Sequence, residues 1–149
     1  MKIFEICEDE LINFELYGLI TTHNDSIRLV YQLNMAFETR FERCEDLEIM
    51  IENQQTFFPM FEWEDTDNGL HFNLIKNTAY TLKKNKKSES LIDMFDLNPP
   101  LIPDYKKYNF LLKITEEVWG DFPFHENSFI QNISKLKTDK LKMIDRLIF

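Results

Sequence analysis

The chain has 149 residues, of which 44% are hydrophobic and 29% are charged. This length fits one domain, and the composition is that of a folded globular protein rather than a disordered one, so we expect a single domain over residues 1–149. A net charge of −9, from 17 basic and 26 acidic side chains, argues against binding to nucleic acids or anionic membranes, because these polyanions attract lysine and arginine.

The first predicted elements are a strand, a helix and a weaker strand. Apolar and polar residues alternate over 12–20, and this period of two predicts a strand. Helix N-cap candidates follow at 23–26, and apolar residues then recur every three or four positions, which predicts an amphipathic helix over 26–38. A less regular alternation predicts a further strand near 46–52.

The strongest local signal is the Asn68-Gly69 pair between two apolar runs at 56–67 and 70–78. Asn-Gly is the favoured pair of a two-residue type I′ hairpin turn, because both central residues need positive φ. The hairpin register that follows has Asp67 opposite Leu70 and Trp63 opposite Leu74. One face of the hairpin then gathers the apolar side chains Phe57, Phe61, Trp63, Phe72 and Leu74.

The middle of the chain changes from a charged segment to a proline-rich one. Residues 83–90 are predicted to form a solvated loop, and 91–95 one helical turn. Prolines at 99, 100 and 103 exclude a helix interior in the next segment.

The last predicted elements are a strand and a second helix. Alternation over 108–114 predicts the strand, and Gly120 and Pro123 indicate a loop at 118–125. Apolar residues at helical spacing then predict a helix over 126–137, and the residues that carry this pattern are Ser128, Phe129, Ile130, Ile133 and Leu136. The order of elements predicts an α+β fold: a mostly antiparallel sheet of about five strands with two helices packed on one face.

Two cysteines, Cys7 and Cys44, stand outside any metal-binding or redox spacing. Two isolated thiols favour a reducing compartment. Acidic residues interrupt the N-terminal apolar stretch, and no run of about 18 apolar residues follows. We therefore expect a cytoplasmic protein with no membrane partner and no nucleic-acid partner.

No established catalytic or phosphate-binding motif occurs in the sequence. The three glycines are too far apart for a phosphate loop, and no serine lies in a nucleophile elbow. The acidic stretch 62–69 has the wrong spacing for a calcium loop. We expect no cofactor, no metal site and no catalytic residue of a known motif class.

Dispersed residues leave a second hypothesis open. His23, His71 and His125, together with Asp104 and Glu116, are the side chains that could converge into an enzymatic or ligand-binding site. Such a site requires at least two of them within hydrogen-bond reach in one pocket.

Three aromatic residues, Trp119, Phe122 and Phe124, lie close together in the predicted loop. Exposed aromatic side chains are unfavourable in water, so these residues either cap the core or form a partner-binding surface. We prefer capping and keep the three residues as candidates for partner binding.

A short segment resembles the signature of the IPExxxVDY family of small bacterial proteins, found mainly in Bacteroidetes. The residues that carry the resemblance are Ile102, Pro103, Asp104, Tyr108, Asn109 and Phe110. Ile102 and Pro103 match identically, whereas Asp104, Asn109 and Phe110 are conservative replacements of Glu, Asp and Tyr. Residues 28–34 (RLVYQLN) and the terminal Leu-Ile-Phe are also similar to the family. The resemblance implies a bacterial, cytoplasmic protein and no particular activity.

Two functional hypotheses follow. The first is a non-enzymatic protein-interaction or assembly module, a homo-oligomer or a complex with a protein partner. The uneven charge supports it: residues 1–75 carry 4 basic and 16 acidic side chains, and residues 76–149 carry 13 and 10. Folding could also mix these charges over the surface. The second is an enzyme or small-ligand-binding protein that uses the dispersed residues.

Overall fold

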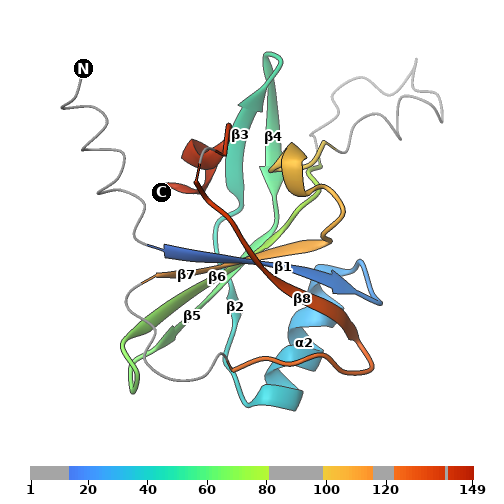
Figure 1. Cartoon of the computed structure of the whole chain (residues 1–149), viewed down its shortest axis with the longest axis vertical. Coiled ribbons are helices and arrows are strands. Elements are labelled where there is room, and N and C mark those ends of the chain that lie inside the picture. The colour runs from blue at the N-terminus through green and yellow to red at the C-terminus, as the bar shows by residue number, and fades with distance from the viewer. Residues whose placement is uncertain (1–13, 81–98, 116–122, 140) are drawn as a thin grey trace.

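The computed structural model describes residues 14–80, 99–115, 123–139 and 141–149 (Figure 1). The loop expected at 83–90 and the helical turn expected at 91–95 lie outside these residues. So does most of the loop expected at 118–125.

Six strands form one sheet, in which every neighbouring pair is antiparallel. Their spatial order is β2-β5-β6-β7-β1-β8, with the bounds β1 Phe14–Thr21, β2 Glu42–Arg43, β5 Met60–Asp65, β6 Leu70–Lys76, β7 Phe110–Thr115 and β8 Ile130–Leu136. β3 (Leu47–Ile51) and β4 (Gln54–Phe58) form a separate hairpin that extends from the sheet at the top of Figure 1. The strands predicted at 12–20, 46–52 and 108–114 are confirmed.

The described residues contain one α-helix, α2 (Ser26–Phe37), and two short 3₁₀ helices, η1 (Pro103–Tyr105) and η2 (Ile144–Leu147). The mostly antiparallel sheet is confirmed, but the prediction of two helices is wrong. α2 begins where the Asp25 carboxylate accepts a hydrogen bond from the Ile27 N–H at 3.0 Å. It ends at Glu38, which adopts the left-handed conformation with φ 56°.

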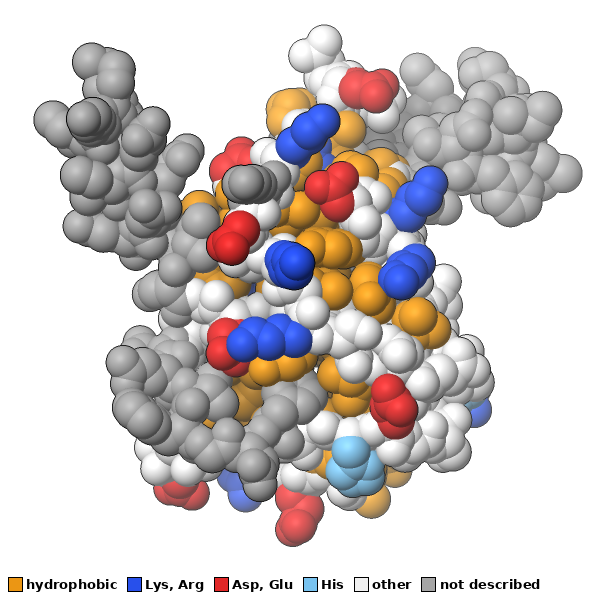
Figure 2. Space-filling model, in the orientation of Figure 1, with side chains coloured by type: hydrophobic (Ala, Val, Ile, Leu, Met, Phe, Trp, Pro, Cys, Tyr) orange, Lys and Arg blue, Asp and Glu red, His pale blue; other side chains and the backbone are white. Residues whose placement is uncertain are grey.

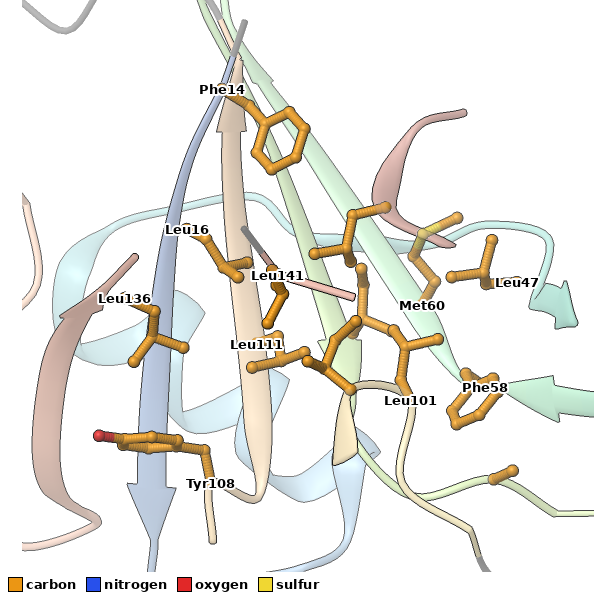
Figure 3. Close-up of a cluster of buried hydrophobic side chains, with 14 residues drawn as sticks. Phe14, Leu16, Leu47, Phe58, Met60, Leu101, Tyr108, Leu111, Leu136 and Leu141 are labelled. Atoms are coloured by element: carbon orange, nitrogen blue, oxygen red, sulfur yellow. The ribbon is translucent and has the colours of Figure 1, made fainter. Parts of the chain in front are cut away.

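Both faces of the sheet are buried, but by different means. On one face α2 packs through Leu29, Val30 and Leu33. The opposite face is covered by the β3–β4 hairpin, the proline-rich segment and the C-terminal segment. This second cluster is shown in Figure 3, where the labelled side chains are Phe14, Leu16, Leu47, Phe58, Met60, Leu101, Tyr108, Leu111, Leu136 and Leu141.

The segment predicted as a helix over 126–137 contains strand β8. Its pairing with β1 shifts register: Thr21 lies opposite Ile130, whereas Ile20 lies opposite Asn132. The extra residue in β8 places Ile130 and Ile133 on the same face, where both pack in the cluster under α2. A three-residue apolar spacing that imitates a helix thus arises from a β-bulge.

The β5–β6 hairpin has a longer loop than predicted. Asp65, not Asp67, pairs with Leu70, and Trp63 pairs with Phe72. Only the glycine of the Asn68-Gly69 pair has positive φ (69°), so a type I′ turn is not formed, and the loop spans 66–69. The shift is two residues and therefore keeps the same side chains on the same face.

The run predicted as one strand over 56–67 is divided by Pro59 between β4 and β5. Phe57 therefore lies in the β3–β4 hairpin and not on the apolar face of β5. The two-residue turn with positive φ at both positions occurs instead at Glu52 (49°) and Asn53 (63°), between β3 and β4.

Asn77, directly after β6, holds the proline-rich segment against the sheet. Its Nδ2 donates hydrogen bonds to the carbonyls of Tyr105 and Tyr108, both at 3.0 Å. Its Oδ1 accepts from the N–H groups of Leu101 at 3.1 Å and Ile102 at 3.2 Å. The amide is buried and bonded at both ends, so it supplies the partners that an irregular buried segment otherwise lacks.

We predict that Asn77→Asp lowers the free energy of unfolding by on the order of 3 kcal/mol, because a carboxylate cannot donate to two buried carbonyls. Urea denaturation measures the change. Asn53→Asp, an exposed turn substitution, serves as the control and is expected to stay within about 0.5 kcal/mol of the wild type. Equal effects of the two substitutions would contradict the role of Asn77.

A second close contact joins Gly18 of β1 to the Tyr108 ring. A Cβ atom at residue 18 would lie 2.5–2.8 Å from three ring carbons. Gly18→Ala is therefore expected to destabilise the fold by about 1–3 kcal/mol through overpacking. In a Tyr108→Leu background the same substitution should be milder, and additive effects in a double-mutant cycle would rule out the contact.

Candidate functional site

Polar side chains gather at one end of the sheet face that α2 does not cover. Glu62 of β5 pairs with Asn73 of β6, which in turn pairs with Lys113 of β7. The next row along the same strands is Glu64, His71 and Thr115. Because side chains two residues apart share a face, both rows point to the same side.

These two rows line a groove of about 760 Å³ that is open to solvent. Its other lining residues are Cys44, Glu45, Met60 and Phe149. We call this surface the sheet groove. The next row on the same face of these strands is apolar. It consists of Met60, Ile75 and Leu111, which belong to the cluster in Figure 3.

Lys113 is buried beneath the C-terminal segment and is 5% exposed. Its Nζ donates a hydrogen bond to the carbonyl of Leu147 at 2.6 Å. The rings of Phe14 and Phe149 lie 4.8 and 3.8 Å from Nζ, as cation–π contacts. Burial lowers the pKa of Lys113 from 10.5 to about 8, because the charged form loses solvation.

Asn73 is the second buried polar side chain of the sheet groove, and it is also 5% exposed. Its Nδ2 contacts the sulfur of Met60 at 3.9 Å. Among the described residues its side chain makes no stronger hydrogen bond. Asn73 and Lys113 thus lie next to each other on paired strands, both largely buried beneath the sheet groove.

The rim of the sheet groove is acidic. Glu62 lies 3.5 Å from His71, measured from Oε1 to Nε2. Burial, and then the charge of Glu62, raise the pKa of the nearby Cys44 thiol to about 11. Cys44 is therefore protonated at neutral pH and is not an activated nucleophile. Within the described ranges, no three His, Cys, Asp or Glu side chains are placed to hold a metal ion.

The structure does not bring the predicted dispersed residues together. His71 lines the sheet groove, but His23 follows β1 and His125 packs edge-on against Phe37 with ring centroids 5.0 Å apart. Asp104 is exposed in η1, and Glu116 lies outside the described residues. Among the described members of that set, His71 is the one that lines the sheet groove.

Of the three loop aromatics, Phe124 is within the described residues. It is 5% exposed, and its ring lies 5.1 Å from that of Phe37 and 6.1 Å from that of Phe72. This placement in the core accords with the capping interpretation. For Trp119 and Phe122, outside the described residues, both interpretations stay predictions.

The family-motif segment contributes to the core and to η1. Ile102, Tyr108 and Phe110 are buried, and Pro103 begins η1. The N–H groups of Tyr105 and Lys106 bond to the backbone carbonyls of Ile102 and Pro103, so backbone groups close this turn. Asn109 accepts a hydrogen bond at Oδ1 from the N–H of Thr21 at 3.0 Å, which ties β7 to the end of β1.

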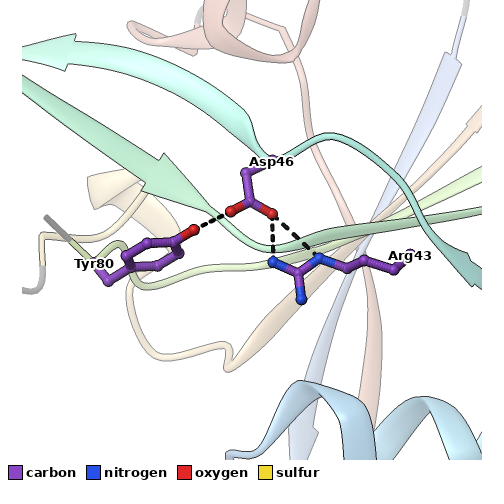
Figure 4. A network of polar contacts seen from close by, with 3 residues as sticks. All are labelled: Arg43, Asp46 and Tyr80. Carbon is purple, nitrogen blue, oxygen red and sulfur yellow. Dashed lines mark hydrogen bonds and ion pairs between the residues drawn. The ribbon is translucent and has the colours of Figure 1, made fainter. Parts of the chain in front are cut away.

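A polar network joins Arg43 of β2 and Asp46, just before β3, to Tyr80, which follows β6 (Figure 4). Arg43 donates to Asp46 Oδ1 at 2.6 Å from Nη2, and the Tyr80 hydroxyl donates to Asp46 Oδ2. The hydrogen bond to Asp46 raises the pKa of Tyr80. Arg43 and Tyr80 each pair with Asp46, so we assign this network to the fold rather than to a binding site.

The outward face of α2 carries an apolar stripe, formed by Ile27, Tyr31 and Met35. These side chains are 65%, 66% and 68% exposed and follow the i, i+4, i+8 spacing of one helix face. We call them the α2 stripe. It lies on the opposite side of the sheet from the sheet groove, because α2 covers the other core cluster.

Charges of both signs are interspersed on the face shown in Figure 2. No helix within the described ranges has the length and apolar character to cross a membrane.

Comparisons with known proteins gave no match to a protein-family model, to a curated protein or to a solved structure. The resemblance to the IPExxxVDY family therefore stays a prediction from the motif residues.

The lowered pKa of Lys113 predicts a specific pH dependence. The unfolded chain binds more protons than the folded chain between about pH 8 and 10.5, so stability rises with pH as this lysine loses its proton. From pH 7.5 to about 9, wild type should gain stability relative to Lys113→Met, and the raised pKa of Cys44 does not affect this comparison because both proteins contain that thiol. Urea denaturation at both pH values measures this gain.

The control is Lys135→Met, since the side chain of Lys135 is 61% exposed. We expect its stability to follow that of the wild type over the same interval. A constant difference between wild type and Lys113→Met across these pH values would show that the ammonium group is not desolvated.

Proposed function

We propose that the protein is a non-enzymatic, cytoplasmic assembly module that associates with a second copy of itself through the α2 stripe. The observation that carries this proposal is the exposure of three large apolar side chains on one face of a capped helix. Scattered exposed apolar residues are ordinary, but a continuous row of them is typical of an interaction surface.

The stripe is self-complementary in an antiparallel arrangement. A two-fold axis at Tyr31 places Ile27 of each copy against Met35 of the other and the two Tyr31 rings together, which is the symmetry of an isologous interface. Arg28 lies in the first half of α2 and Glu38 at its end, and both are exposed. The same axis places Arg28 of one copy opposite Asn34 of the other, about one helical turn from Glu38, and this opposite charge favours the antiparallel orientation.

The size of the surface supports a weak association. One twelve-residue helix presents less area than the roughly 1,200–2,000 Å² of a standard stable interface. The expected complex is therefore a concentration-dependent dimer. Membership of the IPExxxVDY family and a bacterial cytoplasmic location remain parts of the same proposal, supported by the motif residues and by the isolated cysteines.

We predict a dimer that strengthens from about 10 µM to about 1 mM protein and is lost in Tyr31→Ser, as measured by sedimentation velocity. The matched control is Met50→Ser on β3, where an equally apolar side chain is 62% exposed outside the stripe. Wild type that stays monomeric throughout, or a dimer that Tyr31→Ser leaves intact, overturns the proposal.

Charge reversal tests the orientation. Arg28→Glu and Glu38→Arg should each weaken the dimer by like-charge repulsion, and the double variant should recover most of the wild-type association. Failure of the double variant to recover would contradict antiparallel packing.

A further inference from the structure

We propose that Asn68 and Gly69 form a self-modification site, at which Asn68 loses its side-chain nitrogen as ammonia through a cyclic imide made with the backbone nitrogen of Gly69. The site lies in the loop of the β5–β6 hairpin, apart from the lining of the sheet groove and from the α2 stripe. It goes beyond the proposed assembly function and does not rest on it.

The backbone nitrogen of Gly69 is the nucleophile. Its N–H donates no hydrogen bond to any residue in the described part of the chain. A backbone amide held in a hydrogen bond gives up its proton slowly, whereas an unbonded one in a loop exchanges it readily. A Cβ atom at residue 69 would have no atom within 4 Å beyond its chain neighbours. The nitrogen is therefore neither tied to the fold nor covered by it.

The side-chain amide of Asn68 is the electrophile, and asparagine is among the chemically labile residues of proteins. The whole loop 66–69 is exposed. The Asn68 Nδ2 donates a hydrogen bond to Asp65 Oδ2 at 2.8 Å, and the carbonyl side of the amide has no partner among the described residues. Glycine is the one successor that lacks a Cβ atom, which after other asparagines crowds the attacking nitrogen.

Water is the only co-reactant in the reaction. The Gly69 N–H gives its proton to solvent, and the nitrogen forms a bond to Cγ of Asn68. The Cγ–Nδ2 bond then breaks, and the leaving nitrogen takes up a proton and departs as ammonia. Water opens the imide at one of its two carbonyls. Cleavage of the new bond to Cγ gives an aspartyl residue at position 68, and cleavage of the backbone bond gives an isoaspartyl linkage.

Both products alter the end of the hairpin. A carboxylate oxygen replaces the Nδ2 donor, so the hydrogen bond to Asp65 is lost and two negative charges face each other beside Asp67. In the isoaspartyl product the main chain also runs through the side chain of residue 68, which lengthens the loop next to the Asp65–Leu70 pair. Older copies of the protein thus carry an added negative charge at a disturbed hairpin end.

Peptide mass spectrometry of the full chain, incubated at neutral pH and physiological temperature, measures the conversion. The internal control is Asn53, which is also exposed in a turn but precedes Gln54. We expect Asn68 to convert at least tenfold faster than Asn53 and to give both products, with the isoaspartyl form identified by labelling with an isoaspartyl-specific carboxyl methyltransferase. A smaller ratio, or conversion without isoaspartyl product, overturns the proposal.

Two further measurements test the parts played by the fold and by Gly69. The native chain should convert at Asn68 within tenfold of the rate in the guanidinium-unfolded chain, and a larger difference would show that the folded loop prevents the reaction. Gly69→Ala adds a methyl group beside the nitrogen, in open space and in an exposed loop, and should slow conversion at least fivefold. A smaller effect of this variant would contradict attack by the Gly69 nitrogen.

Discussion

The buried amide of Asn77 is the constraint on which the side of the sheet opposite α2 depends. A six-stranded sheet with two apolar faces needs two covers, and the described part of the chain has one α-helix. Apart from the β3–β4 hairpin, the other cover is irregular, and irregular backbone brings N–H and C=O groups that lack partners when buried. Asn77 bonds four such groups, in residues 101, 102, 105 and 108. Leu101 and Ile102 can then be fully buried in the core.

Lys113 has the corresponding role for the C-terminal segment. Its ammonium group holds the carbonyl of Leu147, and the Phe149 ring covers it. Desolvating a lysine is unfavourable, as the lowered pKa shows, and a lysine in such a place is a frequent sign of function. Lys113 therefore both holds the C-terminal segment and lines the sheet groove. The α2 stripe, on the other side of the sheet, requires no buried polar side chain, because the backbone N–H and C=O groups of a regular helix hydrogen-bond to one another.

Local sequence signals predicted the elements whose pattern is undisturbed. β1, α2, β3 and β7 follow simple periods of two or 3.6, and their bounds differ by a few residues at most. β8 was missed because a bulge changes its apolar spacing from two to three. The β3–β4 turn was missed because its two positive-φ residues are Glu52 and Asn53 rather than Asn-Gly. The β5–β6 register was wrong because Asn68 does not adopt positive φ.

The candidate site was harder to predict than the fold. His71 was singled out, but Asn73 and Lys113 were not, because the simple inference for a polar residue in an alternating strand is that it faces solvent. That inference fails where both faces of a sheet are covered, since a polar residue then has no solvent side. The contacts of Asn77 and Lys113 reach 24–34 residues along the chain, beyond any local pattern. The sequence did offer one signal for Asn73 and Lys113: each is a polar residue within an otherwise apolar stretch of a strand.

The central claim is that Asn77 turns an irregular segment into part of the core. Native-state hydrogen exchange of the backbone amides of Leu101 and Ile102 tests it most directly, because both donate to the Asn77 side chain. The account predicts protection comparable to that of the β6 and β7 amides. Exchange at the rate of an exposed loop would show that the proline-rich segment does not form a fixed cover.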